Sequence, residues 1–283
     1  MKIIVTGATG FVGRHLVERL LLSGHEIIAV ARNSVRFNEM IWRDRVRCIA
    51  CDIHAGIDDT TLLKESPDAL MHLAWPGLPN YKQRFHFEQN LPADYRFLKS
   101  VVEHGIKHVI VTGTGAEYGL QSGCLAEDAP TAPVNAYGIA KDTLRRYMQY
   151  LQTSYKFTLQ WVRLFHMYGP GQNPASLLAQ LDKAIDHGAA AFDMSTGEQL
   201  RDYLPVQEVA RRLALLVSHP ECEGVINCCS GTPVSVRRLV EDRLKERGVS
   251  IALNLGCYPY PDYETMAYWG NPRKLLSVLG DEA

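Results

Sequence analysis

The chain has 283 residues, of which 46% are hydrophobic and 22% charged, as is usual for globular proteins. Its formal net charge of −1 predicts no basic surface for nucleic acid, although a local basic pocket for a phosphate-bearing ligand is compatible with it. No stretch approaches the roughly 18 apolar residues of a membrane helix, and the short apolar run after Lys2 does not fit a signal peptide. We expect a cytoplasmic protein without membrane or nucleic-acid partners.

The seven cysteines predict neither disulfides nor a metal site. Cys48 and Cys51 form a C-x-x-C pair, but no second pair follows at zinc-ribbon spacing. Disulfides are rare in the cytoplasm, and the number of cysteines is odd. We interpret them as small core residues and expect no bound metal.

The first half of the chain alternates short apolar runs with helical patterns. We predict strands over residues 3–5, 26–31, 46–50, 69–73 and 108–112, and helices over 11–22 and 91–104. A helix over 136–155 and strands over 158–165 and 225–228 continue the series. This alternation predicts an α/β fold, a doubly wound parallel sheet with helices on both faces (a Rossmann fold).

The pattern loosens after Gly169, where the chain becomes rich in Gly, Pro and Tyr. We predict that residues 1–168, with a return segment near 205–230, form a dinucleotide-binding domain. Residues 169–204 and 231–283 are then expected to form a small C-terminal lobe that binds the substrate.

A glycine-rich turn directly follows the first predicted strand and opens the first predicted helix. Glycines there allow a tight turn and close approach of a pyrophosphate, and the helix N-terminus adds free amides and a favourable dipole. The alternative is a tight strand-to-helix turn without a ligand. The expected contacts with a dinucleotide are Gly7, Thr9, Gly10, Phe11, Val12 and Gly13.

Tyr137 and Lys141 are four residues apart on a predicted helix and therefore share one face. A lysine beside a tyrosine stabilises the phenolate, so that the tyrosine can exchange a proton with a substrate oxygen. By itself this spacing is common on helix surfaces.

The glycine spacing G-x-x-G-x-x-G, with Tyr137 and Lys141 about 125 residues later, resembles the extended short-chain dehydrogenase/reductase family of the NAD-dependent epimerase/dehydratase type. The resemblance implies that Tyr137 and Lys141 are catalytic and also contact the cofactor. It further implies that Thr114, four residues before a Tyr-Gly pair, holds the reacting oxygen. A plain turn threonine is the alternative for Thr114.

Other positions match further elements of the family. The resemblance implies that Asp52 and Ile53 contact adenine, and that Leu73 and Ala74 form the loop under the cofactor. Asn90 matches a buried asparagine before the next helix, which is more often structural than catalytic. The implied substrate-binding residues are Thr114, Glu117, Tyr137, His166, Asn173 and Arg201.

Two of these substrate-binding positions carry an open question. His166 stands where the family usually has asparagine. Arg201 matches an arginine that grips the substrate diphosphate, and a surface salt bridge with Asp202 is the alternative.

At two positions this chain differs from family members that catalyse other reactions, and these differences limit the reactions that we expect of it. Dehydratases carry an acidic pair directly after the catalytic threonine, whereas this chain has Gly115 and Ala116. The epimerase–reductases that make fucose carry a cysteine where this chain has Ala116. Both departures favour a ketoreductase.

The end of the second predicted strand bears on the cofactor. An aspartate there binds the ribose hydroxyls of NAD, but this chain has Arg32 and Asn33. Because arginine accepts a 2′-phosphate, we expect NADP, with NAD as the alternative.

We therefore predict NAD(P)H-dependent reduction of the 4-keto group of a nucleotide-linked 4-keto-6-deoxyhexose, dTDP-linked by overall similarity. A loop over residues 75–81 is expected to line the sugar pocket. The alternatives are a nucleotide-sugar epimerase with tightly bound NAD and, from another class, a non-catalytic NAD(P)-sensing regulator. The resemblance also implies a homodimer through the helix after Leu91 and the helix that carries Tyr137.

Overall fold

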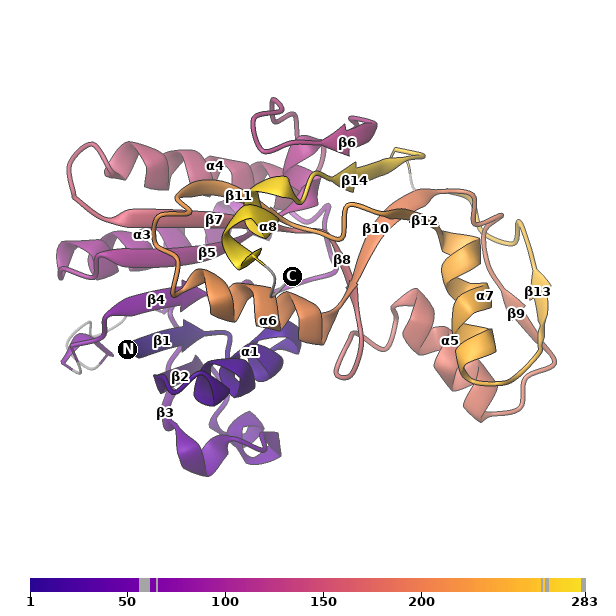
Figure 1. The fold of residues 1–283 in the computed structure, drawn as a ribbon, viewed down its shortest axis with the longest axis horizontal. Helices are drawn as coiled ribbons and strands as arrows, with labels where there is room; N and C mark the ends of the chain where they lie inside the picture. The colour runs from indigo at the N-terminus through magenta and orange to yellow at the C-terminus, as the bar shows by residue number, and fades with distance from the viewer. Residues whose placement is uncertain (56–61, 65, 261, 263–264, 281–283) are drawn as a thin grey trace.

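The computed structural model describes residues 1–55, 62–64, 66–260, 262 and 265–280. Its centre is a seven-stranded sheet in the order β11-β7-β5-β4-β1-β2-β3, in which every neighbouring pair is parallel (Figure 1). The strands are β1 (Lys2–Thr6), β2 (Glu26–Ala31), β3 (Arg47–Ala50), β4 (Ala69–His72), β5 (His108–Thr114), β7 (Thr158–Leu164) and β11 (Gly224–Cys228).

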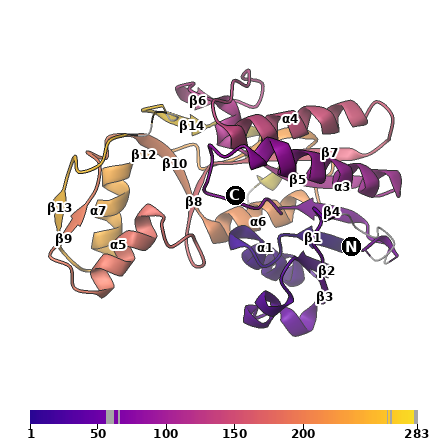
Figure 2. The same cartoon turned by 180° about the vertical axis from the view of Figure 1, so that it is seen from behind.

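Helices cover both faces of this sheet (Figure 2). Successive side chains of a strand point to opposite faces, so that Ile3 packs with α1 (Phe11–Leu22) and α6 (Val206–Leu216), whereas Ile4 packs with α3 (Leu91–Glu103) and α4 (Ala136–Leu151). The strands are therefore apolar on both sides, as a buried parallel sheet requires. The expected doubly wound α/β fold is confirmed.

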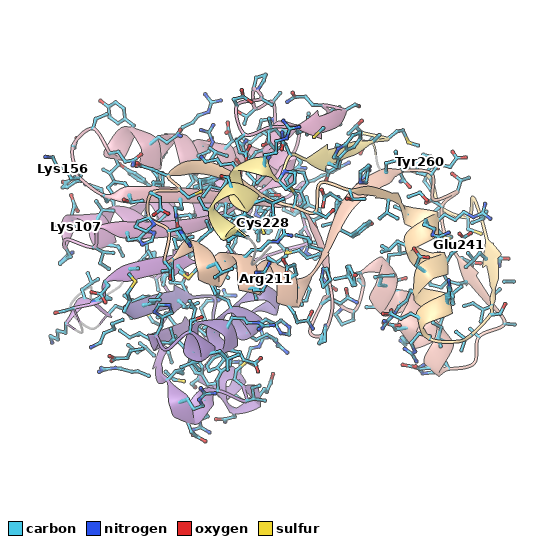
Figure 3. All side chains as sticks on the ribbon, viewed as in Figure 1. Lys107, Lys156, Arg211, Cys228, Glu241 and Tyr260 are labelled. Carbon is cyan, nitrogen blue, oxygen red and sulfur yellow. The ribbon has the colours of Figure 1, made fainter. Side chains whose placement is uncertain are left out.

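A separate lobe contains α5 (Leu177–Asp186), β9 (Ala191–Asp193), α7 (Val236–Glu246) and β13 (Ala252–Asn254). It has its own apolar core, which includes Leu181, Phe192 and Val240. Glu241 on α7 lies at the opposite end of the molecule from Lys107 and Lys156 (Figure 3).

Two smaller sheets connect these parts of the chain. β8 (His166–Tyr168), β10 (Leu200–Pro205) and β12 (Pro233–Ser235) form a three-stranded sheet, and β6 (Gly123–Leu125) pairs with β14 (Tyr268–Gly270).

Most predicted elements lie within a residue or two of the observed ones, but two differences have clear causes. The helix predicted over 136–155 ends at Leu151, because Thr153 and Ser154 donate to carbonyls three residues back and tighten the chain into a turn. The predicted lobe segment 231–283 also differs: α8 (Arg273–Leu279) places Leu275 and Leu279 in the main core. Residues 281–283 of that segment lie outside the described residues.

Across the described parts of the chain, no helix is long and apolar enough to cross a membrane.

Candidate active site

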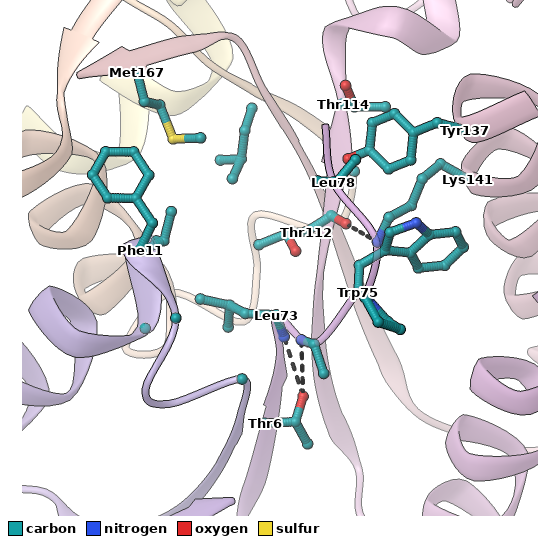
Figure 4. A pocket seen from close by; sticks show the side chains of 18 of the residues that line it. Thr6, Phe11, Leu73, Trp75, Leu78, Thr112, Thr114, Tyr137, Lys141 and Met167 are labelled. Carbon is teal, nitrogen blue, oxygen red and sulfur yellow. Dashed lines mark hydrogen bonds between the residues drawn. The ribbon is translucent and has the colours of Figure 1, made fainter. Parts of the chain in front are cut away.

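A cavity of about 520 Å³ opens at the carboxyl edge of the sheet (Figure 4). It lies at the ends of the paired strands β1 and β4. The strand order reverses between these two strands, and ligands of open α/β sheets bind at such a point. The structure places the following expected dinucleotide contacts along the cavity: Gly7, Thr9, Gly10, Phe11, Val12, Gly13, Arg32, Asn33, Asp52, Ile53, Leu73, Ala74, Tyr137 and Lys141.

The glycine turn is shaped by close backbone contacts. Gly7 has φ +69°, and a Cβ there would lie 2.8 Å from the nitrogen of Ala74. A Cβ on Gly13 would lie 2.2 Å from the carbonyl oxygen of Gly7. The N-terminus of α1 is thereby held against the ends of β1 and β4, and its free amides face the cavity. The residues present fit the pyrophosphate of a dinucleotide.

The start of α4 sets the position of Tyr137. Asn135 caps this helix by accepting the N–H of Gly138 at 2.8 Å. Gly138 packs closely against the turn that follows β5, because a Cβ there would be 2.8 Å from the carbonyl oxygen of Ala116 in that turn. Tyr137 thus faces Thr114, whose hydroxyl favours the ionised form of the phenol. Figure 4 shows both side chains pointing into the cavity.

Lys141 is a fully buried cation one turn further along α4. Its Nζ donates to the carbonyl oxygen of Thr112 at 2.8 Å and lies 4.1 Å from the centroid of the Trp75 ring. Burial lowers the pKa of Lys141 to about 8, against the opposing charges of Asp94 and Glu117. Lys141 therefore remains mostly protonated at neutral pH.

Burial raises the pKa of Tyr137, and the hydrogen bond from Thr114 opposes this only in part. The lowering that we expected from Lys141 is not found: burial dominates the pKa of Tyr137, and Tyr81 and Glu117 raise it further. At neutral pH Tyr137 is therefore a protonated phenol, which suits a proton donor.

The six expected substrate-binding residues divide into two groups. Thr114, Tyr137 and His166 line the cavity. Among the residues that the structure describes along the cavity, Glu117, Asn173 and Arg201 do not appear.

Each residue of the second group has another structural role. Glu117 is fully buried behind Thr114. Arg201 is buried and lies with its guanidinium 5.0 Å from the centroid of the Tyr268 ring. Asn173 is exposed and accepts the N–H of Ala175 at 2.8 Å.

The alternative of a surface salt bridge between Arg201 and Asp202 is wrong. Asp202 is fully buried and accepts the N–H groups of Ser230 at 2.7 Å and Gly231 at 2.9 Å. These bonds hold the chain after β11 against β10. Both residues of this pair are therefore parts of the interior, not of the surface.

Sequence reasoning missed several residues of the cavity wall. Tyr268 lies beside His166, and its hydroxyl is 2.7 Å from His166 Nε2, although the two residues are 102 positions apart. No local pattern could have joined them. His54 could have been predicted from the sequence, because it directly follows the expected adenine contacts Asp52 and Ile53. It lines the cavity and forms a hydrogen bond with Asp94 at 3.1 Å.

The expected loop over residues 75–81 does contribute to the cavity, through Trp75, Leu78 and Tyr81 among others. Its shape depends on a fully buried histidine. His86 accepts the indole N–H of Trp75 at 3.0 Å, and its other ring nitrogen lies 3.1 Å from the carbonyl oxygen of Asn80. The Trp75 ring is thereby fixed beside Lys141.

The fold and the cavity define a Rossmann-type enzyme with a tyrosine and a lysine beside a dinucleotide cradle. Residues 3–229 match the model of the "NAD dependent epimerase/dehydratase family". The chain therefore belongs to this family, whose members are NAD-dependent oxidoreductase-type enzymes of the extended short-chain dehydrogenase/reductase class. The resemblance seen in the motifs is confirmed.

Two curated relatives narrow the comparison. The chain is 32% identical over 272 residues to dTDP-6-deoxy-L-talose 4-dehydrogenase (NAD(+)) of Aggregatibacter actinomycetemcomitans, which covers 95% of this chain and 99% of that protein. It is 26% identical over 255 residues to a Bacillus subtilis (strain 168) protein named as an uncharacterized UDP-glucose epimerase, YtcB, covering 85% and 80% of the two chains.

A solved structure, MoeE5 in complex with UDP-glucuronic acid and NAD, has the same fold. It matches with a TM-score of 0.83 and 28% identity, over 99% of this chain and 93% of that one. A dinucleotide and a nucleotide sugar thus bind together on this fold in a related protein.

Proposed function

We propose that this protein reduces the 4-keto group of a nucleotide-linked 4-keto-6-deoxyhexose, with dTDP as the nucleotide. The observation that carries the proposal is the position of Tyr137 beside Thr114, on the wall of the cavity that the glycine turn also lines. The relative at 32% identity, named for dehydrogenation at C4 of a dTDP-linked 6-deoxy sugar, supports the same class of substrate.

The residues of the site suit a reduction. A bound nicotinamide supplies the hydride for the carbonyl carbon. Tyr137 donates its proton to the carbonyl oxygen, so that one C–H and one O–H bond form. Thr114 holds that oxygen, and the charge of Lys141 stabilises the phenolate that remains.

The wall around Tyr137 is largely apolar. Leu78 and Trp75 line the same cavity (Figure 4). Tyr81 lines it too, and the ring centroids of Trp75 and Tyr81 lie 5.9 and 5.7 Å from that of Tyr137. Such a surface accepts the methyl group of a 6-deoxy sugar better than a hydroxymethyl group, whose hydroxyl would lose its hydrogen bonds to water. This supports a deoxysugar over a common hexose.

For the cofactor we propose that the chain accepts NADP(H) as well as NAD(H). Arg32 and Arg36 line the cavity where β2 ends, and they suit a 2′-phosphate. The relative named for NAD(+) supports the unphosphorylated cofactor. Arg32→Ala is expected to raise the KM for NADPH about tenfold, the value of one charge-assisted contact, and to leave the KM for NADH within about twofold. Steady-state kinetics with each cofactor measures the difference, and equal changes would count against the 2′-phosphate contact.

A nucleotide-sugar epimerase is the second candidate, supported by the relative named as a UDP-glucose epimerase. It requires NAD that stays bound through purification and no net consumption of NAD(P)H. A non-catalytic sensor has less support, because it has no use for a buried lysine beside a tyrosine in the cavity.

A nicotinamide absorbance assay separates the candidates. Purified protein is given NADPH or NADH with dTDP-, GDP- and UDP-linked 4-keto-6-deoxyhexoses. Oxidation of the cofactor with the dTDP-linked sugar supports the proposal. No oxidation with any sugar, together with NAD released on denaturation, favours the epimerase.

We also propose a homodimer through α3 and α4. These helices pack side by side, and α4 carries Ile139, Tyr147 and Tyr150 on its exposed surface. Exposed aromatic and aliphatic side chains on neighbouring helices are typical of an interface. Light scattering of the purified protein tests this assembly.

A further inference from the structure

Glu117 is a fully buried carboxylate directly behind the cavity wall. It belongs to η4 (Gly115–Tyr118), the single helical turn that follows β5. Its two oxygens accept the indole N–H of Trp161, and one of them accepts the Nε–H of Arg163 at 2.8 Å. A buried carboxylate destabilises the fold unless it is paired in this way. Its position beside the reactive residues therefore suggests that it has a function there.

Its closest link to the site is the backbone of Thr114. Glu117 Oε1 accepts the N–H of Thr114 at 2.8 Å, while the Thr114 hydroxyl accepts the N–H of Ala116 at 3.2 Å. These reciprocal bonds form a capping box, which fixes the first residue of the turn. Because the Thr114 side chain faces Tyr137 on the cavity wall and acts on its phenol, the carboxylate sets where the Thr114 hydroxyl lies relative to that phenol.

There is little room for Glu117 to move. A Cβ on Gly113 would lie 2.5 Å from Glu117 Oε1 and 2.2 Å from Trp161 Nε1, so the backbone of β5 lies directly on the carboxylate. The bonds from Trp161 and Arg163, both on β7, hold it from the other side.

The negative charge of Glu117 also reaches the reactive groups on α4. It raises the pKa of Tyr137 and that of Lys141. Tyr81 and the ring of His86 also face Tyr137, from the loop after β4 and from η3 (His86–Asn90).

The other charges around these two groups come from two helices. Asp94 on α3 acts on Lys141 in the same direction as Glu117. Arg145, on α4, lies 3.8 Å from Glu117 Oε2 and offsets part of its charge.

We propose that Glu117 is a positioning residue for proton transfer: it fixes Thr114 against Tyr137, and its charge holds the proton on Tyr137 until the substrate oxygen takes it. The proposal rests on the proton-donor role of Tyr137 in the proposed function. It replaces the substrate contact that the sequence suggested, because Glu117 lies behind Thr114 and not in the cavity.

Two substitutions separate the two parts of this role. Glu117→Gln keeps an acceptor for the Thr114 N–H but removes the charge that raises the pKa of both Tyr137 and Lys141. The alkaline limb of kcat that reports this pair is therefore expected to move down by about one unit. Glu117→Asp keeps the charge but loses reach, so kcat is expected to fall about 10- to 100-fold with that limb unmoved. KM and the Kd for the dinucleotide are expected to stay within about threefold for both, since neither ligand touches Glu117.

The pH profiles are measured in whichever reaction the wild-type protein catalyses, ketosugar reduction or epimerisation, because Tyr137 exchanges a proton in both. Inactivity of the wild type in reduction alone contradicts the proposed function and leaves this measurement possible. A limb that stays in place in Glu117→Gln, or a loss of dinucleotide binding equal to the loss of kcat, overturns the role of Glu117.

Removing a buried charge partner can prevent folding. A second pair of variants therefore leaves Glu117 unchanged and alters the arginines near it. Arg145 and Arg146 both bond Asp142, but only Arg145 approaches Glu117. Arg145→Gln leaves the carboxylate less compensated and is expected to move the limb upward by about half a unit, whereas Arg146→Gln is expected not to move it. Equal behaviour of these two variants also overturns the proposal.

Discussion

The cavity has two sides that are built in different ways. The glycine-loop side, formed by residues 7–13, has its backbone packed so closely that Gly13 has no room for a Cβ. The opposite side, which we call the lobe side, is formed by His166 and Met167 of β8, by Tyr268 of β14 and by Thr265, and in it the side chains of His166 and Tyr268 hold each other.

This difference predicts two kinds of response to substitution. Close backbone packing cannot adjust, so a change on the glycine-loop side disturbs the cradle itself. Paired side chains can lose a single hydrogen bond at a modest cost. The proton-transfer group, which lies between the two sides, should respond independently of both.

The largest expected effect is on that group. Tyr137→Phe removes the donated proton and is expected to lower kcat about 1,000-fold, while the Kd for the dinucleotide changes less than about twofold because the glycine-loop side is intact. Stopped-flow kinetics and a binding titration measure the two. Tyr258→Phe, at an exposed position outside the cavity lining, is the control. A parallel loss of binding and turnover would contradict the separation.

Lys141 offers the next test, because its burial opposes stability. Its charged form is disfavoured in the folded protein, where burial lowers its pKa from the ordinary 10.5 to about 8. The penalty is therefore fully present below pH 8 and disappears as the pH rises toward 10.5. Lys141→Met removes it and is expected to add about 3 kcal/mol to the free energy of unfolding at pH 7.

Urea unfolding at several pH values measures this effect. The gain of Lys141→Met over the wild type should shrink between pH 8 and pH 10.5, and turnover should be lost at every pH. A variant that is less stable than the wild type at pH 7 would show that the bonds of Lys141 outweigh its desolvation. Lys156→Met, at the far end of the molecule, is the control.

The glycine-loop side is tested by Gly13→Ala. The added Cβ would lie 2.2 Å from the Gly7 carbonyl oxygen, so the turn must open. We expect the Kd for the dinucleotide to rise about 10-fold, corresponding to an overpacking cost of about 1–3 kcal/mol, with the KM for the sugar little changed. Gly24→Ala is the control: its φ of +78° also strains an alanine, but its Cβ meets nothing within 4 Å, so dinucleotide binding should not change. Unchanged dinucleotide affinity would mean that this side is not rigid.

The same difference decides how much could be predicted from the sequence. The glycine turn and Asp52 each follow a strand directly, so that local patterns place them at one edge of the sheet. Glu117 lies within a recognisable motif, but the direction of its side chain depends on Trp161 and Arg163, whose strand pairs with β5 only in the folded chain.

The position of the last helix was also difficult to predict from the sequence, because it depends on contacts between distant parts of the chain. The return of α8 to the main core depends on where Leu275 and Leu279 find an apolar surface, which periodicity alone does not reveal. Likewise, the pairing of His166 with Tyr268 is created by the fold, since β14 lies beside β6 and β10.

The smallest expected effect is on the lobe side. Tyr268→Phe removes the hydroxyl that lies 2.7 Å from His166 Nε2 but keeps the ring beside Arg201. The loss of one hydrogen bond of about 1 kcal/mol predicts a roughly three- to tenfold rise in the KM for the nucleotide sugar, with kcat and the Kd for the dinucleotide nearly constant. Tyr258→Phe, at an exposed position, should have no effect. If Tyr268→Phe weakened dinucleotide binding as much as sugar binding, the two sides of the cavity would act as one unit, and the contrast between backbone and side-chain construction would not govern recognition.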